Sequence, residues 1–252
     1  MKVIFNADDF GLHRSVSLGI LESIKDGVVR STTVLANVIA PEQKAWLRKV
    51  KELNGSFGVH LCLTLGKPLT NFPEEYLTED GRFNRQVLFS PMGIPRLSRD
   101  VIFRELSAQI EEVLAYEPAH LDSHHHIHGF WNVFEVVKEL ALKLKLPVRA
   151  ITTDMRDHLR SVGITCADLF IDRFFGKNNL TVENLQCLLK NARAMDAKVV
   201  EVMCHPGFMK DFPAGLSSYI EEREIELQVL RTPSLRAFFE EEGIEVASYE
   251  AV

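Results

Sequence analysis

The sequence predicts an α/β protein, a distorted (β/α) barrel of seven or eight parallel strands. Short apolar or β-branched runs alternate with helical patterns along the whole chain, which favours a parallel sheet with helical crossovers. The chain has 252 residues, the usual size of an α/β barrel built as one domain, so we expect a single domain spanning residues 1–252. An open doubly wound sheet is the alternative, but the glycine-rich phosphate loop that typically follows its first strand is absent.

The first quarter of the chain alternates strands and helices. Val3–Asn6 is a mostly apolar run that predicts a strand, and the β-branched residues of Thr32–Val38 predict a second. Phe57–Leu65 alternates apolar and other residues with a period of two, which predicts a third strand. Helical spacing between these strands predicts two helices, Val16–Lys25 and Ala45–Leu53.

The segment Gly66–Leu97 interrupts this alternation. It contains four prolines and three glycines and has no clear periodicity. A loop of this length inside a compact domain is usually functional or mobile. We interpret it as a candidate lid or substrate wall, the alternative being a surface excursion that only connects a strand to a helix.

The rest of the chain returns to alternating elements. Asp100–Leu114 has helical spacing with Ser98 as a candidate N-cap, and Val133–Leu146 is an amphipathic helix stopped by Pro147. Three further helices are expected at Thr181–Met195, at Tyr219–Leu230 and from Pro233 to the residue before Gly243. The remaining expected strands are Ala119–Ser123, Val148–Thr152, Ala167–Ile171, Val199–Cys204 and, as an eighth, Ile244–Ser248.

Charge and hydropathy exclude several classes of function. The formal net charge is −6, whereas a general nucleic-acid binder would carry a basic field. No apolar run approaches the roughly 18 residues of a membrane span. Acidic residues appear too early for the apolar region of a signal peptide, so we expect a cytoplasmic protein without nucleic-acid or membrane partners. The oligomeric state stays open, a homodimer included.

Polar residues follow several of the expected strands. Asp8 and Asp9 follow the first, His60 lies on the face of the third opposite its apolar row, and His205 follows the strand that ends at Cys204. The carboxyl ends of barrel strands form one rim, where active sites of this fold lie, so these side chains would converge. One of the two aspartates can then ligate a metal while the other handles protons. A polar turn is the alternative for the pair.

Four histidines fall within five positions: His124, His125, His126 and His128. Imidazole is a common metal ligand through its neutral nitrogen. If the residues before the cluster form a strand, His124 stands at its end. His125 then points away from the site, and His126 returns toward it. We expect only one or two of the four to be ligands, a fortuitous polar loop being the alternative.

Asp9, His60 and His124 would make a site of two histidines and one carboxylate with open positions. That set suits zinc or another divalent ion in a hydrolase, and also non-haem iron. His205 is a candidate proton donor, or alternatively a turn histidine. Arg149 would steady a carboxylate of the site, or make a routine ion pair.

These residues carry a resemblance to a known family. NADDFG near the N-terminus, GVHLCLTLGKPL around His60, HLDSHHHIH and the later CHPG together resemble the YdjC-like carbohydrate deacetylases, the ChbG-type chitooligosaccharide deacetylases. The resemblance implies a distorted barrel related to polysaccharide deacetylases. It also implies a divalent metal, Mg²⁺ or Zn²⁺, whose three ligands are Asp9, His60 and His124. Asp8 would be the catalytic base and His205 the catalytic acid.

The expected function is therefore metal-dependent hydrolysis of the acetamide of an N-acetylated sugar such as a chitooligosaccharide. Asp122, His126 and Arg149 are expected to orient ligands or contact substrate. A metal phosphoesterase or another amidohydrolase is an alternative, as is a sugar-binding protein without catalysis. Such a binder would not need both Asp8 and His205, which counts against the last alternative.

Overall fold

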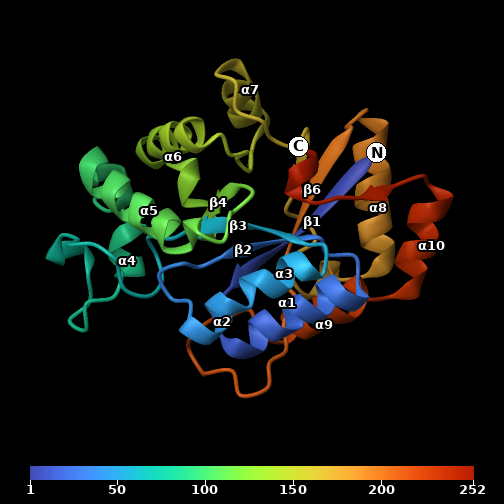
Figure 1. Cartoon of the computed structure of the whole chain (residues 1–252), viewed down its shortest axis with the longest axis horizontal. Coiled ribbons are helices and arrows are strands. Elements are labelled where there is room, and N and C mark those ends of the chain that lie inside the picture. Colours follow the sequence, from blue (N-terminus) through green and yellow to red (C-terminus); the bar gives the residue numbers. More distant parts are fainter.

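The computed structural model describes residues 1–252 and shows one curled sheet of parallel strands, a half-barrel with helices around it (Figure 1). The strand order is β4-β3-β2-β1-β6-β5, with β7 also paired to β1. This arrangement confirms the α/β barrel class. The strands are β1 Lys2–Phe10, β2 Ser31–Val34, β3 Ser56–Leu61, β4 Leu121–Ser123, β5 Leu169–Ile171, β6 Val199–Cys204 and β7 Glu245–Val246.

The long central strand β1 organises the sheet. It pairs with β6 from Lys2 to Ala7, while its other edge pairs first with β7 and then with β2. The first strand is longer than the expected Val3–Asn6, because it continues through the two aspartates. Their carboxylates find partners inside the sheet, so the burial of polar residues does not end the strand.

Helices flank the sheet between successive strands (Figure 1). The predicted helices form within a few residues of their expected bounds, Ala45–Leu53 as α3, whereas the short helix α2 before it was not predicted. The longer helices are α1 Arg14–Asp26, α5 Arg99–Leu114, α6 Trp131–Leu144, α7 Thr153–Ser161, α8 Val182–Ala194, α9 Glu221–Leu230 and α10 Pro233–Glu241. The short ones are α2 Pro41–Ala45, α3 Leu47–Glu52 and α4 Arg85–Leu88.

The prediction of a strand at Val148–Thr152 is wrong. Only Val148 forms a β-bridge, to Leu121 of β4, and the chain then turns into the unpredicted helix α7. The Thr152 hydroxyl caps that helix by accepting from the Met155 N–H at 3.1 Å. The sheet path therefore runs only from β4 at one edge to β5 at the other.

The third strand ends at Leu61, four residues earlier than predicted. The N–H of Cys62 donates to the Gln109 side chain at 2.8 Å, and the Cys62 carbonyl accepts from the same amide at 2.6 Å. A buried glutamine of α5 thus replaces the neighbouring strand as hydrogen-bond partner. Strand periodicity alone does not reveal such a partner.

The segment Gly66–Leu97 contains α4 and two 3₁₀ turns, Glu74–Tyr76 and Ile94–Arg96. The buried carboxylate of Glu105 on α5 accepts the N–H groups of Leu69 and Thr70 at 3.0 and 2.9 Å. Five apolar side chains of the segment are buried: Phe72, Phe83, Leu88, Ile94 and Leu97. The segment is therefore attached to the core, and this favours the interpretation as a wall.

Both chain termini lie at the amino-terminal end of β1 (Figure 1). The Glu245 N–H donates to the Met1 carbonyl at 3.0 Å, and the Ala247 N–H donates to the Val3 carbonyl at 2.9 Å. The polar residues described below lie toward the opposite, carboxyl-terminal end. No helix combines the length and the apolar character needed to cross a membrane.

Candidate active site

The two adjacent aspartates both reach the interior of the half-barrel. Neighbouring side chains of a regular strand point to opposite faces. Here Asp9 has a positive φ of 74°, and the pairing of β1 with β2 shifts register between Ala7 and Phe10. This bulge turns Asp9 back toward the face that already carries Asp8, so both carboxyl groups serve one site.

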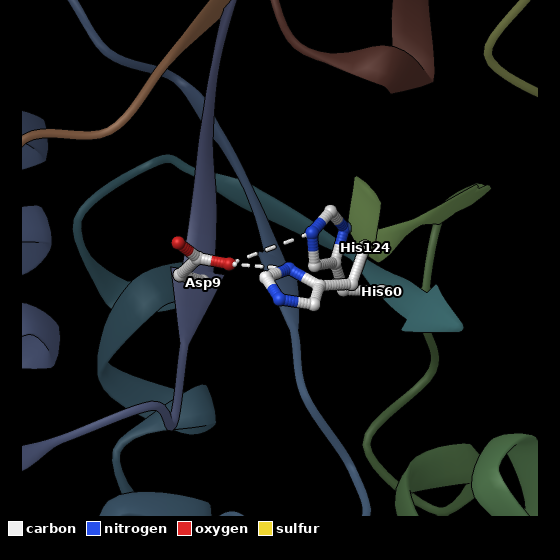
Figure 2. A group of neighbouring side chains, drawn as sticks. All are labelled: Asp9, His60 and His124. Carbon is white, nitrogen blue, oxygen red and sulfur yellow. Dashed lines mark ion pairs between the residues drawn. The ribbon is translucent and has the colours of Figure 1, made fainter. Parts of the chain in front are cut away.

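Asp9, His60 and His124 come together at the carboxyl ends of three strands (Figure 2). Asp9 Oδ1 lies 3.1 Å from His124 Nδ1 and 3.6 Å from His60 Nε2. This oxygen is buried and has no hydrogen-bond partner. An unpartnered carboxylate oxygen facing two ring nitrogens fits a cation, because ligands about 2 Å from one ion lie this close to one another.

Two further residues hold these side chains from behind. Asp122 accepts a hydrogen bond from His60 Nδ1 at 2.8 Å, which leaves Nε2 facing Asp9. Arg223 of α9 donates from Nη2 to the other oxygen of Asp9, Oδ2, at 2.5 Å. Burial alone would raise the pKa of Asp9, but Arg223 and the nearby imidazoles hold it well below its ordinary value. The Asp9 carboxylate is therefore charged, as a metal ligand must be.

Asp8 forms a bidentate pair with Arg149, whose two terminal nitrogens donate to its oxygens at 2.8 and 2.7 Å. Arg149 is fully buried and also contacts Asp122 at 3.0 Å and Glu201 at 2.8 Å. Burial works against ionisation of Asp8, but the guanidinium keeps its pKa well below the ordinary value. Asp8 is thus an ionised carboxylate, available to accept a proton.

His205 follows β6 and faces Asp8. Its Nε2 lies 4.0 Å from Asp8 Oδ2, and its Nδ1 lies 4.0 Å from Glu226 Oε1. The buried Glu226 carboxyl also accepts the backbone N–H of His205 and the hydroxyl of Tyr219. Burial lowers the pKa of His205 to about 4, so its imidazole is neutral near pH 7.

The other histidines of the cluster point in different directions, because the backbone has a positive φ at both His125 and His126. The expectation that His125 points away from the site is wrong, because it lines the cavity and bonds the Thr64 hydroxyl at 2.9 Å. His126 lines the same cavity without bonding the three convergent residues. His128 is buried against the Ser123 hydroxyl and the Arg149 carbonyl. The structure therefore brings only His124 of the four into the group with Asp9 and His60.

These side chains line a cavity of about 660 Å³. Asp8, Asp9, His60, His124 and His205 contribute to one part of its wall. The wall also contains Arg85 of α4 and the rings of Phe175 and Tyr219, which stack with centroids 4.4 Å apart. The Gly66–Leu97 segment thus contributes to the cavity through Arg85.

The buried charges of this region are unequal in number. Five carboxyl groups face two guanidinium groups: Asp8, Asp9, Asp122, Glu201 and Glu226 against Arg149 and Arg223. An excess of buried negative charge is costly unless a cation or protons balance it. Burial raises the pKa of Glu226 to about 8 and that of Glu201 to about 7, so protons balance part of this excess, and a divalent cation beside Asp9, His60 and His124 would balance more.

Sequence reasoning missed Arg223 and Glu226, which lie on the buried side of α9. Their one detectable signal is spacing, since residues three apart on a helix share a face. That face also carries Leu227 and Leu230, so both charges fall among core positions. Glu201 was also missed, because it lies among the apolar residues of strand β6.

Comparison with known proteins decides the family. The model of the family described as YdjC-like protein matches residues 2–241. The chain belongs to the YdjC-like family. A relative named carbohydrate deacetylase, from Geobacillus stearothermophilus, is 39% identical over 98% of this chain and 96% of its own length. Another, named chitooligosaccharide deacetylase, from Proteus mirabilis (strain HI4320), is 35% identical over 98% of this chain and 97% of its own.

Two solved structures share the fold of this chain. This YdjC-like chain resembles the crystal structure of an Enterococcus faecalis V583 protein, provisionally described as a cellobiose-phosphate cleavage protein. The TM-score is 0.87 and the sequence identity 31%. The match covers 99% of this chain and 98% of that one. A family 4 carbohydrate esterase from Streptomyces lividans matches with a TM-score of 0.53 and 11% identity over 99% of this chain and 94% of its own, which shows a shared fold.

Proposed function

We propose that this YdjC-like protein removes the acetyl group from N-acetylated sugars of the chitooligosaccharide type, in a reaction that needs a divalent metal ion. The observation that carries the proposal is the convergence of Asp9, His60 and His124 beside the pair Asp8 and His205. The two curated relatives named for deacetylation of carbohydrates support the substrate class.

Asp9, His60 and His124 would hold the metal, with Mg²⁺ and Zn²⁺ as the candidate ions. The chemistry that a divalent cation supplies at such ligands is Lewis acidity toward water and toward the acetamide carbonyl. Asp122 fixes which nitrogen of His60 faces the site, and Arg223 fixes Asp9. Two of the three proposed ligands, His60 and Asp9, are thereby held in one orientation.

Asp8 and His205 would handle the protons. The reaction adds water to the acetamide, breaks its C–N bond and releases acetate and a free amine. Asp8 is ionised and accepts the proton of the attacking water. His205 is neutral and must gain a proton before it can donate one to the leaving nitrogen. Asp8 Oδ2 lies 4.0 Å from His205 Nε2, so we infer that the proton taken from water passes from Asp8 to His205 and from there to the amine.

The decisive experiment measures acetate release from N-acetylated chitooligosaccharides with metal, with chelator, and after metal is restored. Alanine substitution of Asp9, His60 or His124 should reduce turnover by about 10³-fold or more, because catalysis loses its electrophile. His158→Ala is the control, since His158 lies on α7 and contacts Lys138, away from the cavity. Full activity in the three variants would contradict the metal site. Phosphate release from sugar phosphates without acetate release would favour a phosphoesterase.

A further inference from the structure

A stacked pair of rings lies inside the half-barrel, at the end away from the cavity. Tyr249 follows β7 near the C-terminus, and His120 precedes β4. Their ring centroids are 3.6 Å apart with an interplanar angle of 8°, and both residues are buried. Neither ring nitrogen of His120 has a hydrogen-bond partner. This histidine therefore serves as a flat surface against which the phenol ring packs.

Gly58 of β3 makes room for the pair. A Cβ atom at this position would lie 2.5 Å from the His120 ring. No side chain other than hydrogen fits there while the imidazole keeps its place. The strand is thus adapted to hold His120, and through it Tyr249, in one orientation.

The phenol hydroxyl begins a chain of hydrogen bonds toward the cavity. It donates to Glu201 Oε2, and Glu201 Oε1 accepts from Arg149 Nε at 2.8 Å. The two terminal nitrogens of Arg149 then hold Asp8. Glu201 of β6 pairs with Ile4 of β1, and Ile4 precedes Asp8 by four residues along the same strand. Arg149 therefore connects two levels of the interior.

We propose that Tyr249 is a positioning residue for Asp8, acting through Glu201 and Arg149; this inference rests on the proposed function. Three carboxylates compete for the Arg149 guanidinium, and its Nε, the nitrogen not bonded to Asp8, is held by Glu201. Glu201 is held in turn on its other oxygen by the phenol. Removing that hydroxyl frees the Glu201 carboxylate to rotate and loosens the guanidinium plane that orients Asp8.

The hydroxyl and the ring of Tyr249 have separable roles. The ring packs with Ile4, Ala247 and His120, whereas the hydroxyl bonds only Glu201. A phenylalanine keeps the packing and removes the hydrogen bond. Tyr249→Phe therefore tests positioning without emptying the core.

The kinetic experiment compares Tyr249→Phe with wild type in acetate release. We expect kcat to fall about tenfold, as for other partners that orient a catalytic group from behind, while KM stays nearly constant. Glu201→Gln should have a similar effect, and the double variant should add little to either, since both act along one path. Tyr116→Phe is the matched control, because Tyr116 lies beside Arg48, outside this network. An unchanged kcat in Tyr249→Phe, whatever its thermal stability, overturns the inference.

A second readout does not depend on activity or metal. In the metal-free protein, the Nε–H of Arg149 should exchange with solvent faster in Tyr249→Phe than in wild type, as followed by side-chain NMR. Tyr116→Phe should leave the exchange unchanged. If wild type releases no acetate, the proposed function fails while this arm still reports on the Arg149 hydrogen bonds. Equal exchange in Tyr249→Phe and wild type overturns the inference.

Discussion

At the scale of single residues, the site depends on side chains that contact the proposed ligands from the side away from the cavity. His60 can present either ring nitrogen to the cavity, and its hydrogen bond to Asp122 selects Nε2. Burial tends to lower the pKa of His60, but Asp122 and Asp8 raise it above its ordinary value. The same carboxylate thus orients the ring and makes it a more basic ligand.

Asp122→Asn tests this role. The amide oxygen can still accept from Nδ1, but the negative charge that makes the imidazole basic is lost. We expect the affinity for Zn²⁺ to fall by about tenfold or more, measured by competition with a chelator. Asp172→Asn is the control, since Asp172 lines the same cavity but lies outside the group of convergent ligands. Equal losses in both variants would show that general charge, rather than orientation of His60, controls affinity.

Residues at strand ends were predictable, and residues that support them were not. Asp8, Asp9 and His205 follow apolar runs, so the rim of a barrel brings them together. Arg223 and Glu201 lie within regular elements, and only tertiary partners explain why their charges are buried. Burial of a charge depends on what lies opposite, which single-chain periodicity does not contain.

At the scale of elements, the turn after His205 is held between two helices. The Gly207 N–H donates to the Arg223 carbonyl of α9 at 3.1 Å, and the Phe208 N–H donates to the Ser15 carbonyl of α1 at 3.3 Å. Gly19 of α1 permits this approach, since a Cβ atom there would lie 2.5 Å from the Gly207 backbone. The position of His205 therefore depends on a helix that contributes no catalytic side chain.

Gly19→Ala should reduce both stability and turnover. In an exposed helix interior, this change stabilises by about 1 kcal/mol, because alanine is the better helix former. Here the new methyl group meets backbone atoms that cannot rotate away, so we expect a net loss of about 1–3 kcal/mol in the free energy of unfolding. Urea denaturation and acetate release measure the two effects. Lys25→Ala on the exposed side of α1 is the control, and a stabilised, fully active Gly19→Ala protein would contradict the argument.

At the scale of the whole molecule, alternation of strands and helices was enough to predict the class of fold. It could not show that a single bridge at Val148 replaces the expected fifth strand. The residues after Val148 leave the sheet because Arg149 pairs with buried carboxylates and Thr152 caps the next helix. The interior of the half-barrel near the cavity is polar, because it holds the buried carboxyl and guanidinium groups described above. Its excess of carboxyl groups links folding to proton uptake.

This linkage predicts how stability depends on pH in the metal-free protein. Burial raises the pKa of Glu226 to about 8, from an ordinary value of 4.5. Between these values the folded protein holds a proton that the unfolded chain has released, so this group lowers the free energy of unfolding as pH rises from 5 to 8. His205 acts oppositely, because its lowered pKa makes the unfolded chain the better proton binder below about pH 6.5.

Glu226→Gln isolates the first contribution. The glutamine amide stays neutral and can still accept the His205 N–H, while the contribution of His205 is common to both proteins. Urea midpoints with chelator present, at pH 5, 6, 7 and 8, should show the stability of the variant rising relative to wild type as pH increases. Parallel pH profiles would mean that Glu226 is already ionised in the folded protein. Because chelator removes any metal ion, the positive charge that stabilises an ionised Glu226 would then have to come from a neighbouring side chain, and Arg223 is the one that lowers its pKa.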